Sequence, residues 1–244
     1  MKKEDSIKNY FVGKISPFLL FEKEYHSLDY VVESHKNDRF YKESNPACQV
    51  AFIGIIAYFE AFCKHQFASI ISIFPELAVQ FSEKRKNLKI DLSTILSFQE
   101  NTLYNLGFII AEKYDFGSPS SVNSNFKDLL LVTPFSKEQS IFFKRMNYKR
   151  NLLVHHAGYY TLQSLNNSKI SIAEYEDKAF IDNVKIDSST YQEYSNFLFE
   201  MALKISLITI ESIKRMDIYK NLNVESSKYQ AVEELSVALF DRIN

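Results

Sequence analysis

Residues that interrupt secondary structure are scarce in this chain, because only five glycines and five prolines occur among its 244 residues. A chain with so few breakers forms long helices more readily than many short strands joined by turns. Hydrophobic residues make up 46% of the sequence, which is enough apolar material to bury a sizeable core. We therefore expect a mainly α-helical bundle that forms a single domain over residues 1–244.

Capping residues predict where the helices begin. Ser-Pro at 16–17 and Asn-Pro at 45–46 each combine an N-cap with proline at the first helical position. The first pair predicts a helix to about residue 35, and the second predicts one to about residue 74. Ser136 and Gln139 fit a capping box, and Gly158 suits the end of the helix that they begin. Further helices are predicted over 93–114, 126–132, 187–216 and 227–243.

Alternating apolar and polar residues occur after Gly158. Lys169–Tyr175 alternates, Ala179–Ile186 is rich in β-formers, and charged residues separate the two runs. This pattern predicts a small β-hairpin between the helix that ends at Gly158 and the last long helix.

The composition argues against several classes of protein. A net charge of −1 provides no global field for nucleic acid or an anionic membrane, so any anion site must be local. Cys48 and Cys63 are expected on one helix about 22 Å apart, too far for a disulfide, and buried free thiols fit a reducing compartment. The N-terminus lacks an apolar signal segment, and the longest apolar run, Val50–Cys63, is too short for a membrane span. We expect a cytoplasmic protein with no membrane partner, no cofactor and no metal.

One stretch, Arg150 to His155, places a permanent cation, an amide and a titratable imidazole near the end of a predicted helix. At about 100° per residue, Asn151 and His155 share a polar arc, whereas Arg150 lies at the edge of the apolar side. A cation there needs a buried partner of opposite charge, or its aliphatic chain must extend far enough along the helix for the guanidinium to reach water. Glu60, stranded in the most apolar helix, is the candidate partner. The residues predicted to face the core from this helix are Phe142, Met146, Leu153 and Val154.

These residue types suit RNA cleavage without a metal. His155 titrates near neutrality and can act as base or acid, and Arg150 can donate two hydrogen bonds to phosphate oxygens. Asn151 lies one turn before His155 and can orient the imidazole or a phosphate. One subunit supplies one such histidine, so a separate acid and base would require a second copy. His156 points about 100° away and is expected to pack or to donate to a carbonyl.

The pattern Arg-Asn-x-x-x-His, late in a helix and followed by glycine, resembles the signature of the HEPN superfamily (higher eukaryotes and prokaryotes nucleotide-binding). Arg150, Asn151 and His155 match it, and the surrounding string looks like the prokaryotic RNase-type branch. The helix around Glu60 is similar to an early helix of that branch, which often carries an acidic residue.

This HEPN-like resemblance covers about residues 45–216. Within it, residues 82–125 look like an insertion, and the C-terminal helix at 227–243 has no counterpart that we can place.

The resemblance implies a metal-independent endoribonuclease that acts as a homodimer through the motif helix. Such a protein would be a toxin or antiviral-defence effector that cleaves single-stranded RNA, with an antitoxin or another defence protein as a possible partner. Lys144, Tyr148 and Lys149 would then bind RNA through charge and stacking, although alone they equally fit a solvated helix face.

Two other interpretations stay open. One is a catalytically inactive HEPN module that binds RNA or partners a nucleotidyltransferase or another defence protein. The other is structural, in which Arg150 and His155 only satisfy buried polar groups inside a helical bundle.

Overall fold

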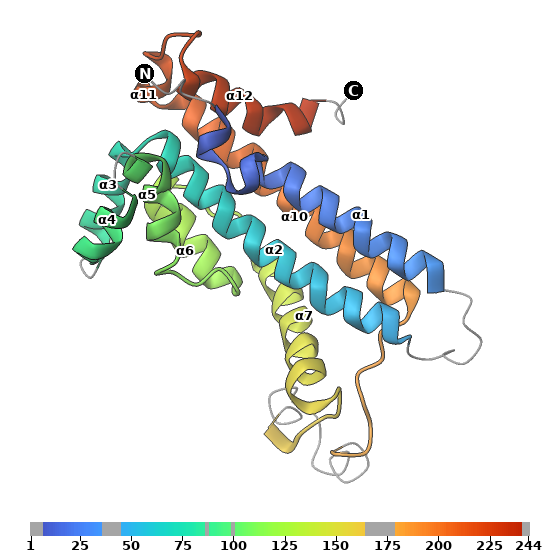
Figure 1. The fold of residues 1–244 in the computed structure, drawn as a ribbon. Helices are drawn as coiled ribbons and strands as arrows, with labels where there is room; N and C mark the ends of the chain where they lie inside the picture. Colours follow the sequence, from blue (N-terminus) through green and yellow to red (C-terminus); the bar gives the residue numbers. More distant parts are fainter. Residues whose placement is uncertain (1–6, 36–44, 86–87, 99–100, 164–178, 241–244) are drawn as a thin grey trace.

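The computed structural model describes residues 7–35, 45–85, 88–98, 101–163 and 179–240, and these form an all-helical fold without a strand (Figure 1). Four helices are long, namely α1 (Pro17–His35), α2 (Pro46–Ile73), α7 (Lys137–His156) and α10 (Ser188–Arg215). The shorter helices are α3 (Glu76–Lys84), α4 (Leu92–Phe98), α5 (Thr102–Ala111), α6 (Pro119–Leu130), α11 (Asp217–Lys220) and α12 (Ser227–Phe240). Two 3₁₀ turns, η1 (Ile7–Tyr10) and η2 (Val12–Lys14), precede α1. The expectation of a mainly α-helical bundle is confirmed.

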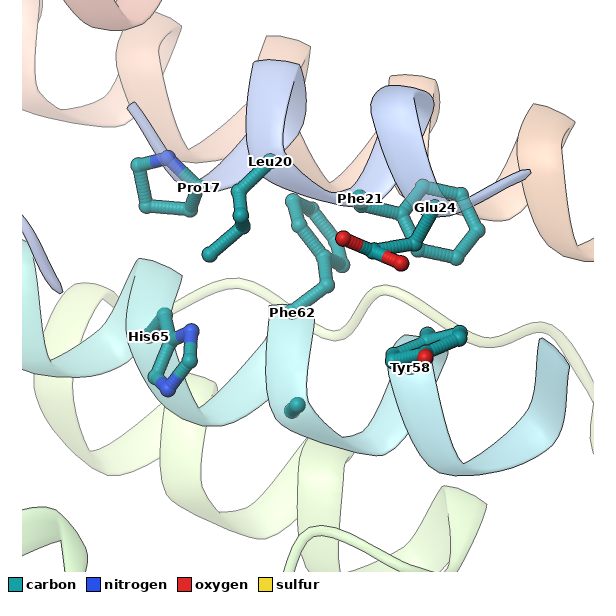
Figure 2. Close-up of a pocket in the computed structure, with 8 residues that line it drawn as sticks. Pro17, Leu20, Phe21, Glu24, Tyr58, Phe62 and His65 are labelled. Carbon is teal, nitrogen blue, oxygen red and sulfur yellow. The ribbon is translucent and has the colours of Figure 1, made fainter. Parts of the chain in front are cut away.

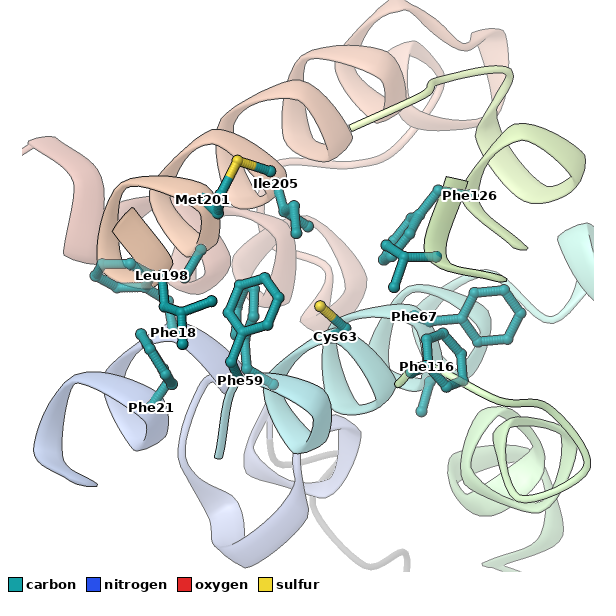
Figure 3. Packing of buried hydrophobic residues seen from close by; sticks show 14 of the residues in the cluster. Phe18, Phe21, Phe59, Cys63, Phe67, Phe116, Phe126, Leu198, Met201 and Ile205 are labelled. Carbon is teal, nitrogen blue, oxygen red and sulfur yellow. The ribbon is translucent and has the colours of Figure 1, made fainter. Parts of the chain in front are cut away.

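Helix α2 forms the centre of the fold, with α1 and α10 alongside it and α5 packed against its C-terminal half (Figure 1). The phenylalanines of α2 are buried. In Figure 3, Phe59 packs with residues of α10, whereas Phe67 packs with Phe126 of α6 and with Phe116 in the loop before α6. One polar link crosses this core, because Gln66 Nε2 donates a 2.9 Å hydrogen bond to Thr209 Oγ1 of α10. The pair satisfies both buried groups and fixes the register of the two helices.

Among the described helices, α2 alone has the length and apolar composition of a membrane span. In the fold it is the core helix on which α1, α5 and α10 pack, and that role explains the same composition. The cytoplasmic location stays a prediction.

The helix starts predicted at Pro17 and Pro46 are confirmed, but Ser16 Oγ is buried without a hydrogen-bond partner and so does not cap α1 as expected. Three other caps are formed. Asn45 Oδ1 accepts from the amide of Ala47 at 2.8 Å at the start of α2. Ser136 and Gln139 form both hydrogen bonds of a capping box at the start of α7. Asp187 Oδ1 accepts from the amide of Thr190 at 2.7 Å and caps α10.

The region 82–125 differs from its predicted form. The helix expected over 93–114 is divided into α4 and α5, and α6 begins at Pro119 rather than at Phe126, with Ser118 as its N-cap. α5 packs closely on α2, where the amide of Gly107 donates to Ser72 Oγ at 3.3 Å. This region therefore contributes to the core of the fold.

The predicted β-hairpin is not supported. Its first half, Lys169–Tyr175, lies outside the described residues. The described half forms no strand but pairs with the residues just after α7, through an antiparallel bridge between Tyr159 and Asn183. Val184 donates from its amide to the carbonyl of Gly158 at 2.9 Å, and the Val184 side chain is buried. The segment around Val184 thus packs on the turn that follows α7, where it forms hydrogen bonds with backbone groups that the helix leaves unpaired.

Candidate functional site

The motif lies at the end of α7, where the last turns of this helix extend beyond the bundle (Figure 1). The earlier turns are anchored in the core by Phe143 and Met146, both fully buried, and the ring of Phe143 lies 5.4 Å from that of Phe59. The helix ends as the sequence predicts, with Ala157 and Gly158 at φ angles of 49° and 85° and the Gly158 amide bonded to the Leu152 carbonyl. The first part of α7 is therefore fixed in the core, and its last turns project from the bundle.

The three motif residues differ in exposure. Asn151 and His155 are exposed, and within the described residues the His155 imidazole has no hydrogen bond. Arg150 is half-buried: its Nη1 donates to Asn151 Oδ1 at 3.2 Å, and its Nε is shut off from solvent without a partner. Five residues along a helix amount to a rotation of about 140° between Arg150 and His155. Within one subunit the guanidinium faces the bundle and the imidazole faces solvent.

Glu60 of α2 is an electrostatic neighbour of Arg150. Burial raises the pKa of the Glu60 carboxyl, the positive charge of Arg150 opposes that rise, and Asp115 adds to it. The two groups form no direct ion pair among the described residues. From the sequence, Arg150 was expected to have either a buried contact with Glu60 or a side chain that reaches water. The structure shows a half-buried Arg150 whose charge acts on Glu60 without a direct contact.

A loop between α5 and α6 completes this side of the site, and its place in the site was not predicted. Asp115 Oδ1 accepts from the Gly117 amide at 2.9 Å, and Asn147 Nδ2 of α7 donates to the Gly117 carbonyl at 2.7 Å. A Cβ at Gly117 would lie 3.1 Å from Glu60 Oε1 and 3.2 Å from Asp115 Oδ1. A side chain there would require these carboxylates to shift by a few tenths of an ångström. The carboxylates of Glu60 and Asp115 therefore lie close together beside Gly117, which Asn147 joins to α7.

The three predicted RNA-binding residues lie on α7 and differ in exposure. Lys144 is exposed, but Lys149 Nζ lies 5.2 Å from the centre of the Tyr194 ring on α10, as a cation–π contact. Tyr148 is half-buried, and its hydroxyl is enclosed without a hydrogen-bond partner. Of these three side chains, Lys144 is the one that is exposed.

Two further expectations for α7 are wrong. Val154 was expected to face the core but is 45% exposed, whereas Leu152 is buried. His156 was expected to pack or to donate to a carbonyl but is exposed. Both differences arise because the end of α7 leaves the bundle, and the segment that contains Val184 leaves these two side chains exposed.

In the part of the chain that the structure describes, no group of three or more His, Cys, Asp or Glu side chains could hold a metal ion. Cys63 is fully buried, and burial raises the pKa of its thiol well above the ordinary value of 9.0, which makes it a poor nucleophile.

Comparison of the chain with protein-family models, curated proteins and solved structures gave no match. The likeness to the HEPN superfamily therefore rests on Arg150, Asn151 and His155, and any function must be argued from the geometry around them.

Proposed function

We propose that this protein is a metal-independent endoribonuclease that acts as a homodimer through the end of α7, as a toxin or antiviral-defence effector. The observation that carries the proposal is the exposed His155 at a projecting helix end. It lies five residues after Arg150, whose charge acts on the nearby Glu60 carboxyl. This arrangement argues against a purely structural role for the imidazole.

The reaction that suits these groups is attack of a ribose 2′-oxygen on the adjacent phosphorus. A base removes the 2′-hydroxyl proton, the new P–O bond forms, and the bond to the 5′-oxygen breaks as an acid protonates that oxygen. The products are a 2′,3′-cyclic phosphate and a 5′-hydroxyl. His155 can serve as base or acid, while Arg150 stabilises the negative charge on the phosphorane.

A second copy would supply what one subunit lacks. One motif contains one imidazole, and Arg150 and His155 point about 140° apart, so they do not converge on one phosphate within a subunit. A two-fold axis near the end of α7 would pair the His155 of each copy with the other. Exposed apolar side chains around this helix end support such a contact, and we call them the α7-end surface: Val154, Tyr159, Leu162, Phe180 and Ile181.

One observation favours the alternative of an inactive HEPN-like interaction or RNA-binding module that partners a nucleotidyltransferase or another defence protein. The charge of Arg150 acts on the Glu60 carboxyl, and its Nε is enclosed without a partner. If this arrangement persists in the assembled protein, the guanidinium helps to hold α7 in place and donates little to a phosphate.

The test is incubation of the pure protein with single-stranded RNA in EDTA. We expect cleavage that leaves 2′,3′-cyclic phosphate and 5′-hydroxyl ends, reduced at least 100-fold in His155→Ala and Arg150→Ala because each removes a group that acts in the transition state. His156→Ala is the matched control, since it removes the neighbouring exposed imidazole.

Sedimentation of the same samples separates the two functions. A folded dimer that cuts no RNA would favour the inactive module. Equal loss of cleavage in His155→Ala and His156→Ala would contradict the assignment of His155.

A further inference from the structure

A cavity of about 210 Å³ lies between α1 and α2, away from the candidate site (Figure 2). Phe62, which forms part of its wall, lies about 200° around α2 from Glu60, so the cavity and the motif are on different sides of this helix. The walls are apolar and are formed by Pro17, Leu20, Phe21 and Phe62.

Three polar side chains also line the cavity, at its two ends. α1 and α2 run in opposite directions, so that Glu24 lies opposite Tyr58 and Pro17 lies opposite His65 (Figure 2). Across the described ranges, the carboxylate of Glu24, the hydroxyl of Tyr58 and the imidazole of His65 have no ion pair or hydrogen bond within the protein. Side chains that are free in this way can bind a ligand without first losing an internal contact.

The charge of this cavity comes from Glu24. The pKa of His65 is lowered from its ordinary value of 6.5, first by burial and then by Lys64, so this imidazole is neutral at pH 7. Glu24 is the one acid in the lining. An anionic ligand would therefore be repelled, whereas a cation would be attracted.

The size of the cavity sets the size of the ligand. At about 30 Å³ per molecule the space would hold roughly seven waters, and it is smaller than the pockets of about 300–1,000 Å³ that take drug-sized ligands. The aromatic faces of Phe21, Phe62 and Tyr58 favour a ring or a short alkyl chain, and they also attract a cation.

We propose that this cavity binds a small primary amine with an aromatic or short alkyl body. The ammonium donates to the Glu24 carboxylate and the Tyr58 hydroxyl, the body packs on Phe21 and Phe62, and its far end approaches His65. This site is separate from the motif, so the proposal does not depend on ribonuclease activity.

Three ligands of similar shape test the proposal: 2-phenylethylamine, 2-phenylethanol and phenylacetate. In calorimetric or NMR titrations at pH 7 we expect the amine to bind at least tenfold more tightly than the alcohol, and the acid not to bind. Glu24→Gln should weaken amine binding at least fivefold and leave alcohol binding unchanged, because it removes charge but little volume. Ala61→Leu, at a lining position, should weaken both by filling the space.

Glu33→Gln is the matched control, since it removes an acid from an exposed position of the same helix outside the lining. Circular dichroism of each variant establishes that it is folded. The proposal fails if amine and alcohol bind equally, if Glu24→Gln and Glu33→Gln have the same effect, or if the amine shows no saturable binding at millimolar concentration.

Discussion

Asn147 of α7 is joined to Gly117 by a 2.7 Å hydrogen bond from Nδ2 to the backbone carbonyl, across 30 residues of sequence. The amide of Gly117 is bonded in turn to Asp115 Oδ1. Asn147 lies one helical turn before Arg150 and Asn151, so this bond fixes the part of α7 that carries the motif against the loop between α5 and α6.

Replacement of this residue should loosen the helix. In Asn147→Ala the Gly117 carbonyl loses its donor, which typically costs about 1–3 kcal/mol. Loss of Asn147 Oδ1, which is buried without a partner, offsets part of that cost. We expect the free energy of unfolding in urea to decrease by about 1 kcal/mol, and hydrogen exchange in α7 to become faster.

Asn151→Ala is the control for this change. Asn151 is exposed, so its replacement should alter the unfolding free energy by about 0.5 kcal/mol or less. If the two variants lose equal stability, the bond to Gly117 does not anchor α7.

The pKa of Glu60 should respond in opposite directions to its two charged neighbours. Arg150→Met removes the charge that opposes the rise in this pKa, so the value should increase further. Asp115→Asn removes a negative charge, so the value should decrease. Titration of the side-chain carboxyl carbon by NMR measures both shifts, and a change of the same sign in the two variants would refute this charge arrangement.

The same group gives a pH dependence of stability. Because its folded pKa is raised above the ordinary 4.5, the folded state binds more protons than the unfolded state between these two values. The contribution of Glu60 to stability is therefore complete below pH 4.5 and is lost as the pH rises through the raised pKa. Relative to Glu60→Gln, the wild-type protein should lose stability across that window.

The helix starts could be predicted because caps are local chemistry. Asn45 and Ser136 satisfy amides only two and three residues away, so three or four residues of sequence contain the whole interaction. Ser118-Pro119 carries the same signal as Ser16-Pro17, but the neighbouring glycine and serines suggested a loop, so the start of α6 was missed.

The rest of the site depends on contacts between distant segments. That Gly117 lies against Glu60 follows from the packing of α5 on α2, which no local pattern encodes. Helical periodicity assigned Val154 to the core because it assumes that the whole of α7 lies on the bundle. The β-forming residues of Ala179–Ile186 suggested a strand, but the partner of that segment is the turn at Gly158–Tyr160.

Contact between α5 and α2 requires a glycine at position 107. A Cβ there would overlap with the backbone carbonyl of Ala68 and lie 2.8 Å from Ser72 Oγ, so the helices would have to separate. We expect Gly107→Ala to lower the unfolding free energy by about 3 kcal/mol, at the upper end of overpacking effects.

Gly54→Ala serves as the matched control within α2. Its Cβ would meet the side chain of Leu28, at 3.3 Å, and the better helix propensity of alanine is worth about 1 kcal/mol. This variant should be neutral or slightly stabilising in the same urea experiment, and a loss as large as that of Gly107→Ala would exclude backbone contact as the cause.

The α7-end surface should decide the oligomeric state if the proposed function is correct. Ile181 is 68% exposed and lies beside Phe180, which is 64% exposed and holds a positive φ of 62° that is unfavourable for an aromatic residue. Ile181→Asp places a charge in a contact that would otherwise exclude water, so sedimentation should show a monomer and RNA cleavage should be lost together. Val224→Asp changes a residue that is 64% exposed in the loop before α12, and it should stay dimeric and active. A dimer that survives Ile181→Asp with full activity would place the two-fold axis elsewhere, because a buried aspartate without a partner is too costly to remain in a tight symmetric contact.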